Sequence, residues 1–180
     1  MKPDPVKGVE CYIDADFAGG RNQEEGKDPG SVLSRTGYVI SYTNCPIVWG
    51  RRIQTEIAIS ITEAEYIDLS QAMRYVLHFV SPIKEIEFIL KIQGDTMTVL
   101  CSLFEKPVTP LTVYEDNQGA IGLVVSPHMR SRTKHIAIKY HHFCSFVANG
   151  DVKINHFNTK EQIMDIFTKL LYSELFGYLR

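Results

Sequence analysis

Four acidic residues of this 180-residue chain occupy places where carboxylates can do chemistry. Asp14 lies within one alternating, strand-like segment and Asp116 ends another. Glu65 and Asp165 lie early in two segments with helical periodicity. In mixed α/β sheets, ligands gather at strand ends and nearby helix starts, so these side chains are candidates for one site. Clustered carboxylates repel unless a cation neutralises them, and oxygen-only ligation suits Mg²⁺ or Mn²⁺ rather than zinc. Two such ions can support phosphodiester cleavage.

Each of these acids also has an ordinary structural interpretation. Asp14 fits the surface of an edge strand, and Glu65 fits the third helical position of a capping box opened by Thr62. Asp116 fits a plain turn, and Asp165 fits the favourable interaction of an acid with a helix N-terminus. Spacing alone therefore leaves a metal site and four separate structural roles open.

The segments that must position the acids alternate between strand and helix patterns. We predict strands at 9–15, 36–43, 47–52, 111–114 and 152–157, with a further extended segment at 55–59 and a turn at 44–46. We predict helices from Ser60 or Thr62 to about 76, from Pro82 to about 93, and at 118–125, 134–149, 163–170 and 173–179. A strand meander followed by alternation predicts a mixed sheet with helices packed on it.

The composition is that of an ordinary globular domain, with 44% hydrophobic and 22% charged residues. The apolar runs are too short for a membrane span, and the first residues do not resemble a signal peptide. The four cysteines form no CxxC pair, which favours buried free thiols over a disulfide framework or a zinc site.

The net charge of -2 hides an uneven distribution, because no acidic residue lies between Asp116 and Asp151. The cations of this acid-free stretch are Arg130, Arg132, Lys134 and Lys139, and it also holds four of the six histidines. Such a stretch can face phosphates or can be a solvated helix face, and charge alone favours the solvated face.

Seven short strings occur in one order along the chain. They are YIDADFAG (Tyr12–Gly19), SRTGYVI (Ser34–Ile40), CPIVW (Cys45–Trp49), TEAEYIDLSQA (Thr62–Ala72), YEDNQGAI (Tyr114–Ile121), RTKHIAIKYHH (Arg132–His142) and EQIMDIFTK (Glu161–Lys169). Together they closely resemble the ribonuclease H domain at the C-terminal end of the polyprotein of copia-type LTR retrotransposons. A single string is a weak signal, but seven in order are specific.

The resemblance implies a ribonuclease H-like α/β fold, with a five-stranded mixed sheet of order 3-2-1-4-5 flanked by helices. It implies one domain over 1–180, with a core at about 9–172, a long loop at 19–35 and a C-terminal extension at 173–180. The family cleaves the RNA strand of RNA–DNA hybrids during reverse transcription, at an Asp-Glu-Asp-Asp quartet that binds two Mg²⁺ ions, with Mn²⁺ as a substitute. Matched string by string, the quartet is Asp14, Glu65, Asp116 and Asp165.

The resemblance also implies partners for the chain. These are an RNA–DNA hybrid and the reverse transcriptase domain of the same polyprotein, at an intracellular location that is cytoplasmic, within virus-like particles, or nuclear. Hybrid binding depends mostly on the phosphate backbone, with the 2′-hydroxyl identifying the RNA strand. The candidate contacts are Arg51, Arg52, Arg130, Arg132 and Lys134. We interpret Trp49 as a core residue rather than as a platform for base stacking.

Some positions depart from the family pattern. Phe17 stands where such elements commonly have Trp, and Asp68 replaces a small residue one turn from Glu65. No histidine lies at 158–164, where many cellular ribonucleases H have a mobile one before the last acid. No reverse transcriptase part precedes Met1, so we expect a fragment, a processed domain or a relic. Two alternatives remain, an inactive remnant that binds nucleic acid or supports a neighbour, and an integrase of the same fold.

Overall fold

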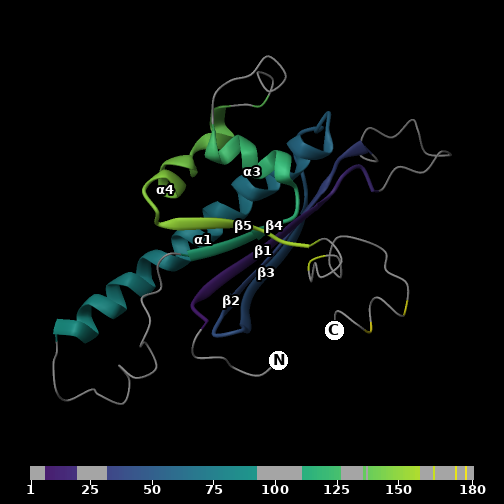
Figure 1. The fold of residues 1–180 in the computed structure, drawn as a ribbon. Helices are drawn as coiled ribbons and strands as arrows, with labels where there is room; N and C mark the ends of the chain where they lie inside the picture. The colour runs from purple at the N-terminus through teal and green to yellow at the C-terminus, as the bar shows by residue number, and fades with distance from the viewer. Residues whose placement is uncertain are drawn as a thin grey trace.

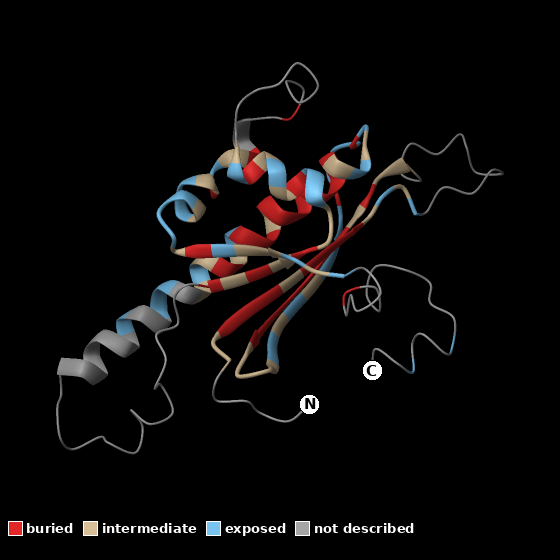
Figure 2. Cartoon of the chain, in the orientation of Figure 1, coloured by how far each residue is buried: buried red, intermediate tan, exposed pale blue. Residues whose placement is uncertain are grey.

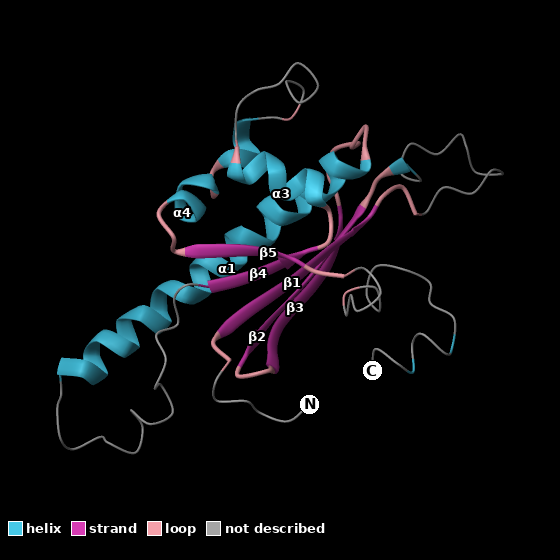
Figure 3. Ribbon diagram, viewed as in Figure 1, coloured by secondary structure: helices cyan, strands magenta, loops and turns pink. Residues whose placement is uncertain are grey.

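The computed structural model describes residues 7–19, 32–92, 111–126, 136, 138–158, 164, 173 and 177. Five strands form one sheet in the order β3-β2-β1-β4-β5 (Figures 1 and 3). The strands are β1 (Val9–Asp16), β2 (Arg35–Tyr42), β3 (Cys45–Ile53), β4 (Leu111–Glu115) and β5 (Val152–His156). The pairs β1–β2 and β2–β3 are antiparallel, and β1–β4 and β4–β5 are parallel. The predicted mixed sheet and its strand order are therefore confirmed.

The described helices lie on the same side of this sheet (Figure 1). They are α1 (Ile61–Ile92), α3 (Gln118–Val125), the 3₁₀ helix η4 (Ile138–His141) and α4 (Cys144–Ala148). The N-terminal half of α1 packs across β1 and β2, and its C-terminal half projects past the strands. None of the described helices combines the length and apolarity that crossing a bilayer requires.

The core lies between β1, β2 and the first four turns of α1, where buried residues concentrate (Figure 2). Alternation along β1 points Cys11, Ile13 and Ala15 toward α1, and all three are buried. From the helix, Leu69 and Met73 are fully buried and belong to the same core cluster. The apolar face of α1 and the apolar face of the sheet therefore form one layer, and their packing determines how α1 lies on the sheet.

Three predicted elements differ in the structure. The helices expected before and after Pro82 are one continuous helix, because the exposed proline removes one backbone hydrogen bond without ending it. The helix expected at 134–149 is two short pieces, η4 and α4, and residues 134–135 and 137 lie outside the described part. The segment 55–59 is not a strand, since it forms the bend that leads into α1.

The turn between β2 and β3 lies one residue earlier than predicted. Thr43 and Asn44 occupy it with φ angles of 48° and 65°, the left-handed geometry of a two-residue hairpin turn. Cys45 and Pro46 belong to β3 instead, where Pro46 is tolerated because β3 is an edge strand next to a bulge. Cys11 is a buried free thiol as predicted, Cys45 and Cys144 are half-buried free thiols, and Cys101 lies outside the described residues.

Candidate functional site

The site begins where β1 and β4 separate. The two strands pair from Glu10 to Tyr12, but β1 continues to Asp16 without β4 beside it. The backbone N–H of Ala15, which points to the side that β4 has left, donates to Glu65 Oε2 at 2.9 Å. Glu65 thus reaches from the second turn of α1 into the gap between the strands. The carboxylate of Glu65 is held here because the backbone N–H on this unpaired edge of β1 needs a hydrogen-bond acceptor.

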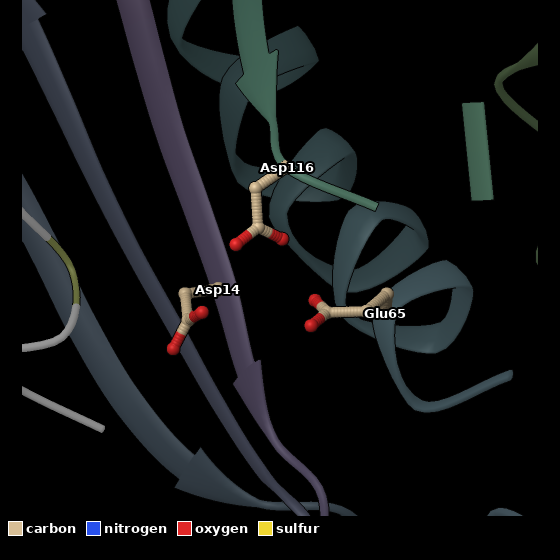
Figure 4. A group of neighbouring side chains, drawn as sticks. All are labelled: Asp14, Glu65 and Asp116. Carbon is tan, nitrogen blue, oxygen red and sulfur yellow. The ribbon is translucent and has the colours of Figure 1, made fainter. Parts of the chain in front are cut away.

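Three carboxylates converge at this gap (Figure 4). Asp14, Glu65 and Asp116 each offer an oxygen, and the three oxygens lie within 4.8 Å of one another. Asp14 is 1% exposed and Glu65 is 4% exposed, while Asp116 is half-buried. The sequence prediction that these three acids meet agrees with the geometry. Asp165 lies outside the described residues, so its place as the fourth member remains a prediction.

The position of Asp116 is set by the start of α3. Asn117 is the N-cap of that helix, and its side chain accepts from the backbone N–H of Ala120 at 3.0 Å. The backbone N–H of Asn117 in turn donates to Glu115 Oε1 at 2.9 Å. Asp116 therefore stands between a buried strand end and a capped helix, which is where the sheet topology was expected to gather ligands.

The electrostatics of the cluster are dominated by burial and by the mutual repulsion of neighbouring acids. Burial raises the pKa of Glu65 well above its usual range, and the nearby charges of Glu115, Asp14, Asp68 and Asp116 raise it further. The donor set is made only of carboxylate oxygens, which is what Mg²⁺ and Mn²⁺ prefer. The residues present therefore fit an oxygen-binding divalent cation.

Two further buried acids were not predicted as part of this cluster. Asp68 is fully buried on α1, and its Oδ2 accepts from the backbone N–H of Gly37 at 3.1 Å. Glu115 is fully buried at the end of β4. Burial is the main cause that raises the pKa of each carboxyl well above its usual range. The family comparison marked Asp68 as an unusual charge near Glu65, but no signal in the sequence marks either residue as buried.

The two predicted binding arginines of β3 lie on opposite faces of the sheet. The strand register places Arg51 opposite Gly37, and Gly37 opposite Asp14, so Arg51 and Asp14 share the face turned away from α1. Arg52 lies on the α1 face, with its guanidinium 5.3 Å from the centre of the Tyr75 ring. Arg130, Arg132 and Lys134 lie outside the described residues.

Trp49 is not a core residue, contrary to the prediction, because its side chain is 59% exposed. Its partner across the strands is Val39, which puts it on the sheet face turned away from α1. The adjacent histidines His141 and His142 contact different residues: His141 Nδ1 lies 2.6 Å from the Tyr66 hydroxyl, and His142 Nδ1 lies 3.4 Å from Ser70 Oγ.

The sequence of the chain is similar to segments of retrovirus-related Pol polyproteins. It is 32% identical over 171 residues to the one from transposon RE1 of Arabidopsis thaliana, and 30% identical over 171 residues to the one from transposon RE2 of the same plant. It is 29% identical over 168 residues to the one from transposon TNT 1-94 of Nicotiana tabacum. These matches cover 95%, 95% and 93% of this chain but 10% of each polyprotein.

The chain therefore spans about a tenth of the length of the curated relatives that it matches. The predicted resemblance to retrotransposon polyproteins is confirmed by these matches. No family model matches the chain. Among solved structures, the chain is similar to LC11-RNase H1, isolated from compost by a metagenomic approach, with a TM-score of 0.45 and 12% identity over 87% of this chain and 89% of that one.

Proposed function

We propose that the chain is the ribonuclease H segment of a retrotransposon polyprotein, a metal-dependent endonuclease that cleaves the RNA strand of RNA–DNA hybrids. The observation that carries the proposal is the convergence of Asp14, Glu65 and Asp116, from three separate elements, within 4.8 Å. Buried carboxylates at this spacing cost folding free energy, whereas a divalent cation converts their repulsion into binding. The similarity to Pol polyproteins from transposons supports a substrate made during reverse transcription.

The three carboxylates would hold Mg²⁺, or Mn²⁺ in its place, with Asp165 as the fourth proposed ligand. When bound, the metal supplies an acidified water and Lewis-acid stabilisation of the phosphodiester. The chain itself orients the ligands, because the Ala15 amide holds Glu65 and the capped start of α3 holds Asp116. Asp116 is the member of the triad that remains half-exposed, so it borders the side from which substrate must enter.

Binding of the hybrid is proposed to depend on backbone phosphates, with the 2′-hydroxyl distinguishing the RNA strand. Arg51 supports this, since it shares a face and a register row with Asp14 and only Gly37 stands between them. A glycine leaves no side chain between the guanidinium and the carboxylate. We further propose the reverse transcriptase part of the same polyprotein as a partner, since the chain matches only a tenth of such polyproteins.

The test is cleavage of an RNA–DNA hybrid labelled on the RNA strand, in Mg²⁺ and in EDTA, with DNA and RNA duplexes of the same sequence as controls. We expect the RNA strand to be cut only in the hybrid and only with metal. Asp116→Asn should abolish cleavage and leave hybrid binding nearly unchanged. Asp16→Asn is the matched control and should be much milder, because Asp16 pairs with Arg35 at 3.6 Å and lies outside the triad.

Hybrid binding without any cleavage in Mg²⁺ or Mn²⁺ would contradict the proposal and favour the inactive remnant. Equal loss of cleavage in Asp116→Asn and Asp16→Asn would show that the acid of β1 has been assigned wrongly or that both β1 acids serve. Cleavage of the DNA duplex at the same rate as the hybrid would contradict the substrate class while leaving the metal site in place.

A further inference from the structure

Two carboxylates on the same side of α1 bind the backbone of two neighbouring strands. Glu65 Oε2 accepts from the amide of Ala15 on β1 at 2.9 Å. Asp68 Oδ2 accepts from the amide of Gly37 on β2 at 3.1 Å. Residues three apart lie on one side of a helix and are separated by about 4.5 Å along its axis. This rise is close to the distance of about 4.8 Å between neighbouring strands, so each acid reaches its own strand.

The strand residue that Asp68 holds lies beside a member of the triad. Gly37 pairs with Asp14 across β1 and β2. Ala15 belongs to the next pair along the same two strands. The two amides that α1 binds therefore come from adjacent rows of the β1–β2 ladder. Asp68 ties the row of Asp14 to α1, and Glu65, itself a triad member, ties the row beyond it.

Stability alone does not explain why an acid is buried at this position. Burial is the main cause that raises the pKa of the Asp68 carboxyl, and the charges of Glu115 and Asp14 raise it further. Among the described residues Oδ1 of Asp68 has no hydrogen-bond partner, so the bond from Gly37 is the one that orients the carboxyl. A buried acid with so few partners is weak evidence for stabilisation, whereas buried acids with a raised pKa are common at functional sites.

We propose that Asp68 is a positioning residue of the triad, which through Gly37 holds Asp14 at the distance from Glu65 that a divalent cation requires. The inference rests on the proposed function, which supplies the cation. Asp68 is not one of the three acids whose oxygens lie within 4.8 Å of one another, so it acts through the backbone of β2. The family pattern has a small residue at this position, so the contact belongs to this chain and not to the pattern.

The test measures the affinity of the full chain for Mn²⁺ by titration calorimetry, without nucleic acid. Asp68→Ala removes the acceptor for the Gly37 amide, and Asp68→Asn keeps an acceptor without the charge. Asp68→Leu also removes the acceptor but fills the buried volume, so it serves if the alanine variant does not fold. Ser70→Ala is the matched control, because Ser70 is a fully buried polar residue of α1 that contacts His142 and not a strand. Circular dichroism gives the folded fraction of each variant.

We expect Asp68→Ala and Asp68→Leu to weaken Mn²⁺ binding per folded molecule by about 10-fold or more, the size typical of lost support for a metal ligand. Asp68→Asn and Ser70→Ala should bind Mn²⁺ nearly as the parent does. Parent affinity in the folded Asp68→Ala or Asp68→Leu protein would overturn the inference, because it is what a merely structural role predicts.

Equal weakening in Asp68→Asn and Asp68→Ala would also overturn the inference, since the charge of the acid and not its hydrogen bond would then matter. Both of these outcomes leave the proposed function standing. A parent that binds no Mn²⁺ would instead contradict the proposed function. A parent that binds Mn²⁺ with the expected order of variants but leaves the hybrid uncut would contradict the proposed function and support the positioning role.

Discussion

Glu65→Gln should make the metal-free protein more stable and the metal-bound protein relatively less stable. In the folded protein without metal, burial and four neighbouring acids raise the pKa of Glu65 above its ordinary 4.5. The stability that this carboxyl contributes is therefore complete below pH 4.5 and is lost as the pH rises toward the folded pKa. Glutamine needs no proton, its carbonyl can accept from the Ala15 amide, and its NH₂ can donate to Asp14 or Asp116.

The size of the stability gain follows from the difference between the pH of the measurement and the ordinary pKa of a glutamate. At about pH 7.5, roughly three pH units above the ordinary pKa, proton uptake on folding costs at most about 4 kcal/mol. Relaxation and water penetration reduce such penalties, so we expect Glu65→Gln to gain about 1–3 kcal/mol, or roughly 2–12 °C in Tm. In Mg²⁺ at about 100 times its Kd, the parent gains about 2.7 kcal/mol, whereas the variant has lost a charged ligand. The advantage of the variant in melting temperature should therefore shrink in Mg²⁺, and it should reverse where the metal-free gain is below about 2.7 kcal/mol.

The assay is thermal melting by far-UV circular dichroism, in EDTA and in millimolar Mg²⁺. Glu63→Gln is the matched control, since Glu63 lies two residues away and its carboxylate accepts from the Ile59 amide at 2.8 Å rather than joining the triad. It should shift Tm by a similar small amount in both conditions. A Glu65→Gln protein that melts below the parent in EDTA, or that gains as much from Mg²⁺ as the parent does, would refute the reasoning.

Three further outcomes follow from other described contacts. The metal-free parent should lose stability as the pH rises from about 4.5 through neutrality, by up to about 1.4 kcal/mol per pH unit for each carboxyl whose pKa is raised. Urea melts at a series of fixed pH values measure this loss, and a stability that does not change with pH would contradict the burial of the acids together. Asp68→Asn keeps an acceptor for the β2 amide and needs no proton, so its Tm at neutral pH should equal or exceed that of the parent, whereas Asp68→Ala should lose about 1–3 kcal/mol; equal melting of the two variants would contradict this. Tyr66→Phe removes the partner of His141 and should cost about 1–2 kcal/mol in chemical denaturation with no change in the cleavage rate per folded molecule, so a large loss of that rate would show that the pair serves the site.

The sheet and the three meeting acids were predictable because they depend on strong local signals. The alternation of apolar and polar residues in β1 places Ile13 and Asp14 on opposite faces of the strand. Asp116 lies between the end of β4 and the start of α3, and a few neighbouring residues are enough to predict both boundaries. The seven ordered strings then fixed the strand order, which periodicity alone does not determine. The acids were assigned to one site from the same combination of strand ends and motif positions.

The burial of Asp68 and Glu115 could not be predicted in the same way. Both residues are charged, and the sequence predicts charged residues to be solvated. Their burial results from where α1 crosses β1 and β2 and from how β4 ends, and neither depends on a short stretch of sequence. The continuous course of α1 through Pro82 could not be predicted either, because a proline favours the end of a helix but does not require it.

The exposed side chain of Trp49 makes the chain a one-site optical reporter. The sequence contains a single tryptophan, and the structure places it on the edge strand with 59% of its surface in contact with solvent. Its intrinsic emission in the folded protein should already lie close to that of a hydrated indole, so unfolding will change the emission wavelength little. Quenching or a blue shift of this emission would instead report that something has covered the outer face of β3, the face on which Arg51 and Asp14 also lie.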